Sequence, residues 1–223
     1  MRLEFSSLEG ELFYSTARGL RSEGLSGSLF GLPVSALIRT PEVEPLRTRI
    51  ELSGSMPVAT LADWSDVTLL DSLTGRAAYN ARLDLCAEGE DCNRLVVVSD
   101  LKGVAVPWPT PLGKPGQESR PLTVTLDLNS SRLRFNYDQR LRAVFGLDGP
   151  LRGRLTFGGE RPALPGDAGL WLDGRIETLE AEQVQALLES QGWLGEPRGD
   201  AEGLRRRSPI RCRCVSWTSR SAR

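Results

Sequence analysis

Apolar and polar residues alternate through much of the interior of the chain. The pattern is strongest between residues 122 and 157, where leucine, valine or phenylalanine occupies nearly every second position and threonine, aspartate or arginine lies between. Successive side chains of a β-strand point to opposite faces, so each alternating segment predicts a strand with one apolar and one polar face. The segments are 122–128, 133–137, 141–147 and 151–157.

Further strands are expected upstream and downstream of this region. Residues 76–85 alternate in the same way, and less regular patterns cover 9–15, 18–30, 33–40, 46–54, 94–106 and 168–178. Short turn sequences, Asn129-Ser130 and Asp148-Gly149-Pro150, join neighbouring strands. Connections this short indicate hairpins, so the strands should pair antiparallel.

Helical patterns are scarce. The clearest covers Glu180–Ser190, where Val184, Leu187 and Leu188 form an apolar stripe, and a shorter helix is expected within 61–73. The 23 glycines, 14 prolines and few aromatic residues suit a turn-rich β protein. We therefore predict a mainly β fold, an extended and twisted antiparallel sheet with one or two short helices.

Such a sheet has more apolar surface than two short helices can cover. A strand of ~8 residues spans ~27 Å, whereas an eleven-residue helix is only ~16 Å long. The surplus must meet a second sheet, close into a barrel, or remain as a groove filled by something apolar. The pattern alone leaves these alternatives open, and a self-packed sandwich is the commoner outcome.

Residues suited to catalysis or metal binding are few. The chain has no histidine, which removes Ser-His-Asp and Cys-His catalysis and the usual zinc, copper and non-haem iron sites. Phosphate-binding loops, dinucleotide fingerprints and nucleophile elbows are also missing from the sequence. We expect a protein that is not an enzyme, with no metal site and no cofactor.

Charge is unevenly distributed along the chain. The net charge is −1, and residues 204–223 contain seven arginines and no acid, so the remaining residues sum to −1 − 7 = −8. An acidic body binds nucleic acid poorly, because that interaction depends on basic surface. We expect no nucleic-acid partner.

Cys86 and Cys92 flank a predicted hairpin connection. Cysteines on either side of a hairpin can reach the short Cα separation that a disulfide needs, and a disulfide would suit an oxidising compartment. Two free thiols in a loop are the alternative. The sequence leaves both open.

Residues 107–116 contain four prolines. Proline lacks an N–H donor, so the strand that ends near Val106 must leave the sheet here. One interpretation is a loop that crosses the rim of a groove, with Trp108 and Lys114 at the rim. The other is a long connection of polyproline type.

Three segments carry a resemblance to a known family. Ser99–Lys114 (SDLKGVAVPWPTPLGK) resembles a stretch of the bacterial YhdP family, AsmA-like proteins in which a strand of this kind runs into a proline-rich loop with a lysine. Leu73–Tyr79 (LTGRAAY) and Leu20–Gly27 (LRSEGLSG) are similar to the same family. The resemblance extends over about residues 8–193 in motif and in strand rhythm.

The resemblance implies a function that composition does not show. Members of the YhdP family are anchored in the inner membrane of Gram-negative bacteria, extend through the periplasm and are thought to conduct phospholipid toward the outer membrane along an apolar β-groove. Phospholipid acyl chains and the rest of the same family protein would then be the partners of this segment. The residues expected to line the groove are Tyr79, Leu83, Leu126, Phe135, Tyr137, Phe145, Leu155 and Phe157. The alternative is a self-packed β-sandwich that serves as a scaffold or protein-binding module.

The two ends of the chain depart from the family pattern. No apolar run is long enough for a transmembrane helix and no signal peptide is visible, so we interpret the chain as an internal fragment. Residues 1–194 are expected to form the groove segment, and residues 195–223 a polar linker and arginine-rich tail. A shift of reading frame shortly after Gly203 would explain the tail, and a basic tail that binds anionic partners is the alternative.

Overall fold

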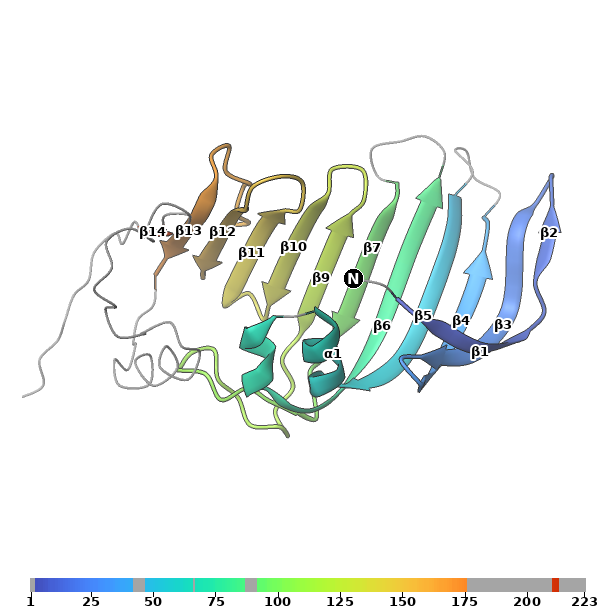
Figure 1. The fold of residues 1–223 in the computed structure, drawn as a ribbon, viewed down its shortest axis with the longest axis horizontal. Coiled ribbons are helices and arrows are strands. Elements are labelled where there is room, and N and C mark those ends of the chain that lie inside the picture. Colours follow the sequence, from blue (N-terminus) through green and yellow to red (C-terminus); the bar gives the residue numbers. More distant parts are fainter. Residues whose placement is uncertain (1–2, 42–46, 66, 87–91, 176–209, 213–223) are drawn as a thin grey trace, which may run out of the picture.

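The computed structural model describes residues 3–41, 47–65, 67–86, 92–175 and, for their backbone, 210–212 (Figure 1). Within these residues the chain is mainly β and forms a single open 14-stranded sheet. This architecture confirms the predicted fold class. The predicted helix at 180–190 lies outside the described residues.

The element bounds follow the predicted segments closely. The strands are β1 (Phe5–Gly10), β2 (Phe13–Ser15), β3 (Gly19–Leu29), β4 (Leu32–Arg39), β5 (Arg47–Pro57), β6 (Thr74–Cys86), β7 (Arg94–Ser99), β8 (Val104–Ala105), β9 (Leu122–Asp127), β10 (Arg132–Tyr137), β11 (Leu141–Gly146), β12 (Arg152–Phe157), β13 (Gly169–Gly174) and β14 (Ile210–Cys212). An α-helix, α1 (Val58–Ser65), and a 3₁₀ helix, η1 (Thr68–Ser72), lie between β5 and β6.

The strands follow one another across the sheet almost in chain order, β1-β3-β4-β5-β6-β7-β9-β10-β11-β12-β13-β14, with β2 on β3 and β8 on β6. Every pair from β1 to β12 along this path is antiparallel, as predicted. The last two pairs, β12–β13 and β13–β14, are parallel. Residues 158–168 run back along β12, so Gly169 pairs with Arg152 at the start of that strand.

Three predicted elements are divided in the structure. The strand expected over 9–15 falls on the end of β1, which stops at Gly10, and on β2, which begins at Phe13. The helix expected within 61–73 begins earlier, at Val58, and is followed by the separate η1. The strand expected over 94–106 ends at Ser99, because Leu101 and Gly103 adopt positive φ angles of 51° and 93° that turn the backbone before β8.

Cross-strand register gathers the apolar side chains on one side of the sheet. One row runs through Ile50, Leu83, Leu95, Leu126, Leu133 and Phe145, and a second through Leu52, Ala81, Val97, Val124, Phe135, Ala143 and Leu155. We call this side the apolar face. The alternate residues, among them Arg82, Thr125 and Arg134, form the polar face.

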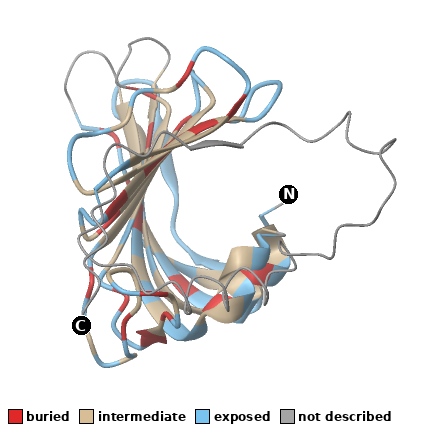
Figure 2. Cartoon of the chain, turned by 90° about the vertical axis from the view of Figure 1, so that its left-hand side faces the viewer, coloured by how far each residue is buried: buried red, intermediate tan, exposed pale blue. Residues whose placement is uncertain are grey.

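The apolar face is covered at one end of its strands. A core cluster joins α1 and the loop after β7 to the ends of β10 and β11, through Val58, Leu101, Val104, Val106, Tyr137 and Leu141. Figure 2 shows the sheet curving, with the helical segment on its concave side. At the other end, Leu128, Leu147 and Leu151 continue the apolar alternation and are 46%, 56% and 51% exposed.

Candidate functional site

All eight residues that the sequence assigned to a groove lie on the apolar face. Phe135 faces Val124 on one side and Ala143 on the other. Leu83 and Leu126 both face Leu95, and Tyr137 faces Leu141, which faces Phe157. A strand period of two places such residues on one side whenever the strands pair in register. The structure therefore brings the predicted set together on one surface.

The eight residues differ in how accessible they are. Tyr137 is 3% exposed and belongs to the core cluster. Phe135, Leu155 and Phe157 are partly buried and pack against that cluster. Tyr137 thus contributes to the covered end rather than to an accessible lining, because the loop between β7 and β9 folds back over it.

The remaining four predicted residues lie outside the core cluster. The side chains of Tyr79, Leu83, Leu126 and Phe145 are half-buried. No second sheet faces them within the described part of the chain, since its strands belong to a single sheet. These four side chains mark the accessible part of the apolar face, and burial raises the pKa of the Tyr79 hydroxyl.

The proline-rich loop covers the end of the apolar face, but Lys114 does not lie at an exposed rim. Lys114 is 5% exposed. Its Nζ donates hydrogen bonds to the carbonyl oxygens of Leu101 (2.8 Å), Glu118 (2.8 Å) and Val104. Burial lowers the pKa of this ammonium group, partly offset by the nearby carboxylate of Glu118. Lys114 therefore stabilises the loop from within through hydrogen bonds to its backbone.

Trp108, the other predicted rim residue, is half-buried and packs against the core cluster. Its indole Nε1 donates a hydrogen bond of 2.9 Å to the hydroxyl oxygen of Ser72, at the end of η1. The indole thereby ties the proline-rich loop to η1. Trp108 is thus placed beside the cluster that covers the apolar face.

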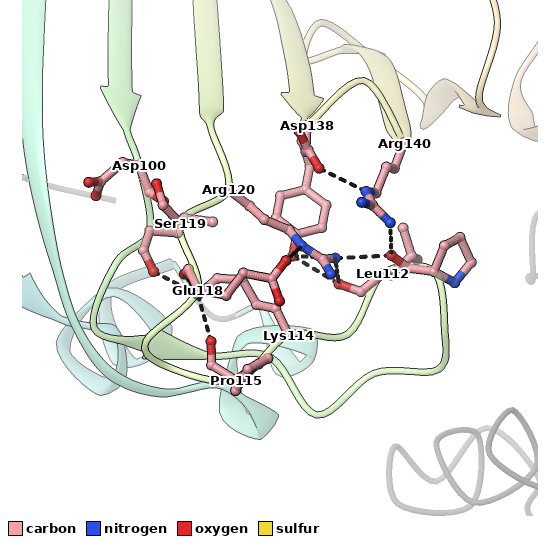
Figure 3. A network of polar contacts seen from close by, with 12 residues as sticks. Asp100, Leu112, Lys114, Pro115, Glu118, Ser119, Arg120, Asp138 and Arg140 are labelled. Carbon is pink, nitrogen blue, oxygen red and sulfur yellow. Dashed lines mark hydrogen bonds and ion pairs between the residues drawn. The ribbon is translucent and has the colours of Figure 1, made fainter.

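Arg120 completes the covered end, and no sequence pattern singled it out. Its guanidinium donates to the carbonyl oxygens of Pro111 and Leu112, each at 3.0 Å, and to the carboxylate of Glu118 at 2.6 Å (Figure 3). The hydroxyl of Tyr137 donates to the same Leu112 carbonyl at 2.8 Å. Burial raises the pKa of this hydroxyl, although the charge of Arg120 opposes the shift. Backbone carbonyls take up most of these donors, so the network holds the loop closed.

The polar face carries cross-strand ion pairs. Arg49 and Asp84 on β5 and β6 are paired at 2.7 Å, and Arg94 and Asp127 on β7 and β9 approach to 3.8 Å. A hollow of about 900 Å³ over β3–β7 opens on this side and is lined by Glu51 and Arg82 but also by Leu37, Val96 and Val98; none of the eight predicted residues lines it. The polar face therefore combines ion pairs with some apolar side chains.

Cys86 and Cys92 are joined by a disulfide across the β6–β7 hairpin, with their Cα atoms 5.6 Å apart. The neighbouring Asn93 donates through its side-chain amide to Asn129 at 3.0 Å, in the turn between β9 and β10. Asn129 in turn donates to the carbonyl oxygen of Cys92. These contacts connect two hairpin ends at the uncovered end of the apolar face.

Comparison with known proteins identifies the family but no individual relative. No curated protein and no solved structure matches the chain. None of the helices in the described residues has the length and apolar character needed to cross a membrane. A family model described as "YhdP protein" matches residues 1–212, a span that includes β14 and so reaches into the segment predicted as linker and tail. The chain belongs to the YhdP family.

Proposed function

We propose that the apolar face binds the acyl chains of phospholipids, and that this segment forms part of a periplasmic conduit between the inner and outer membranes. The observation that carries the proposal is a continuous apolar face that, among the described residues, is covered at one end and carries exposed leucines at the other. Membership of the YhdP family, a family of envelope proteins, supports a role of this type.

Acyl chains suit this surface energetically. Burying one methylene contributes about 0.8 kcal/mol without any directional contact. The accessible residues Tyr79, Leu83, Leu126 and Phe145 provide apolar contacts across several strands. Binding would need no catalytic group, and we propose that the chain is not an enzyme.

A periplasmic location is part of the proposal. The disulfide between Cys86 and Cys92 is consistent with an oxidising compartment. The rest of the same family protein would continue the conduit on either side of this segment. Phospholipid would then pass along the apolar face with its chains against the sheet.

A protein-binding module is the second candidate, because the exposed leucines at the uncovered end could contact another polypeptide as readily as a lipid. A sandwich sealed by a second layer of its own strands is less well supported, since the described strands form a single sheet.

Site-specific photocrosslinking in the bacterial envelope separates the two candidates. A diazirine analogue of phenylalanine is introduced in place of Phe145 or Tyr79, both in the accessible part of the apolar face, and in place of Thr125 on the polar face as the matched control. Mass spectrometry of the adducts should find phospholipid at positions 145 and 79 and little at position 125. Crosslinks at 145 and 79 to other proteins alone would reject the lipid proposal in favour of the protein-binding module.

A further inference from the structure

Two glycines on the apolar face lie directly beneath aromatic rings. Gly54 on β5 is the register partner of Tyr79 on β6, and Gly153 on β12 is the register partner of Phe145 on β11. A Cβ atom added at Gly54 would lie 2.7 Å from the Tyr79 hydroxyl oxygen and 3.0 Å from Cζ. One added at Gly153 would lie 2.6 Å from Cδ1 of Phe145 and 2.9 Å from Cε1. Each ring therefore occupies the space that a side chain on the neighbouring strand would fill.

Backbone conformation does not explain these two glycines. Neither has a positive φ angle, in contrast to Gly10 or Gly149, so other residues could adopt the same backbone. Glycine in the interior of a strand weakens it and often marks a close approach of another group. The closest approach at both positions is that of the aromatic ring. An added Cβ would next meet Leu170 Cδ1 at 3.1 Å from Gly153 and the Pro33 carbonyl oxygen at 3.3 Å from Gly54.

A ring that lies across the adjacent strand extends along the sheet surface and leaves the space above it free. A side chain larger than hydrogen at Gly54 or Gly153 would force the ring away from the sheet and into that space. The two rings are on β6 and β11, four strand spacings apart in the sheet order, which corresponds to about 19 Å. They are thus separate points along the direction that crosses the strands.

We propose that the pairs Gly54–Tyr79 and Gly153–Phe145 set the depth of free space above the apolar face, and so the cross-section of the hydrocarbon chain that it accepts. This inference rests on the proposed function. The preferred ligand is an unbranched acyl chain, which fits over a flattened ring, whereas methyl branches would collide with it.

The first test is binding of cis-parinaric acid, an unbranched C18 chain whose fluorescence rises in apolar sites, to the full chain and its Gly153→Ala variant. We expect affinity to fall about tenfold, the equivalent of losing contact with roughly two methylenes. Gly146→Ala is the matched control. Gly146 belongs to the same strand pair, but its register partner is Arg152 rather than an aromatic residue. The atom nearest to a Cβ added at Gly146 is Nη2 of Arg152, at 3.2 Å. Thermal unfolding of both variants checks that they fold.

The second test separates a role in setting depth from a merely structural one. Phe145→Leu removes the ring and should restore binding when combined with Gly153→Ala. Competition between palmitate and the methyl-branched phytanate provides a readout of cross-section: the wild type should favour palmitate, and Phe145→Leu should reduce that preference several-fold. An unchanged preference, or a double variant that binds no better than Gly153→Ala, would overturn the inference.

The outcomes also distinguish this inference from the function on which it rests. A wild-type chain that binds no parinaric acid contradicts the proposed function itself. A wild-type chain that binds it, with Gly153→Ala and Gly146→Ala equally unaffected, contradicts only the role of the glycine–aromatic pairs.

Discussion

The ammonium group of Lys114 lies 2.8 Å from the carbonyl oxygen of Leu101, within the loop that covers one end of the apolar face. The same group also donates to Val104 and Glu118, so one side chain satisfies backbone carbonyls from both sides of the loop. The loop in turn places Leu101, Val104 and Val106 in the core cluster. The covered end of the sheet thus depends on a buried cation.

Replacing Lys114 by methionine should destabilise the protein by about 2–4 kcal/mol, because buried carbonyl oxygens lose their donor. Lys102→Met is the matched control. Lys102 is exposed and is the other lysine of the chain, and its replacement should change stability by less than about 0.5 kcal/mol. Urea unfolding of the two variants measures the difference. Equal midpoints would show that the hydrogen bonds of Lys114 contribute little.

Acid should weaken the β9–β10 turn through Asp127. Burial alone would raise the pKa of this carboxyl. Hydrogen bonds from Ser130 and the charges of Arg94 and Arg134 outweigh burial and lower the pKa. One of these hydrogen bonds joins the backbone N–H of Ser130 to Oδ1 of Asp127 at 3.1 Å. In the unfolded chain the aspartate carboxyl has a pKa of about 3.9 and therefore binds a proton more readily than in the folded protein. The stabilisation is present above about pH 5 and is lost as pH falls through the folded-state pKa.

Asp127→Asn should reduce the loss of stability between about pH 5 and pH 2, because the titrating group is gone. Asp167→Asn, at an exposed position in the β12–β13 connection, controls for the removal of one carboxylate. Chemical denaturation at a series of pH values provides the measurement. A wild-type pH dependence in the Asp127→Asn variant would show that this carboxyl contributes nothing to acid sensitivity.

Loss of the disulfide should destabilise the chain by about 2 kcal/mol. Cys86 and Cys92 are six residues apart. Closing a loop of this length lowers the conformational entropy of the unfolded chain, which stabilises the folded state by about 2 kcal/mol. The double variant Cys86→Ser/Cys92→Ser, compared with the oxidised wild type by thermal unfolding, measures the effect. Adding a reductant to the double variant is the control and should leave its midpoint unchanged. A variant as stable as the oxidised wild type would contradict the prediction.

Alternation of residue types was enough to predict the strands and to assign their faces. Each step along a strand reverses the side chain's direction, so Leu126, Phe135 and Phe145 could be assigned to one surface before any pairing was known. The turn sequences at 129–130 and 148–150 predicted the β9–β10 and β11–β12 hairpins, whereas no turn indicated that β7 pairs with β9 across residues 100–121. The parallel pairing of β13 with β12 could not be predicted in this way, because the pattern of polar and apolar residues does not show which path residues 158–168 take.

The covered end of the apolar face, by contrast, was decided only in three dimensions. The sequence led us to expect Lys114 in a loop at the rim of a groove. Its burial depends on carbonyl oxygens that the fold brings around it. Tyr137 belongs to a regular apolar alternation, yet it is buried because the loop between β7 and β9 packs over it. Local periodicity determined which way each side chain points. Contacts between distant segments decided which side chains remain accessible. These contacts include the strand registers that set Gly54 against Tyr79 and Gly153 against Phe145.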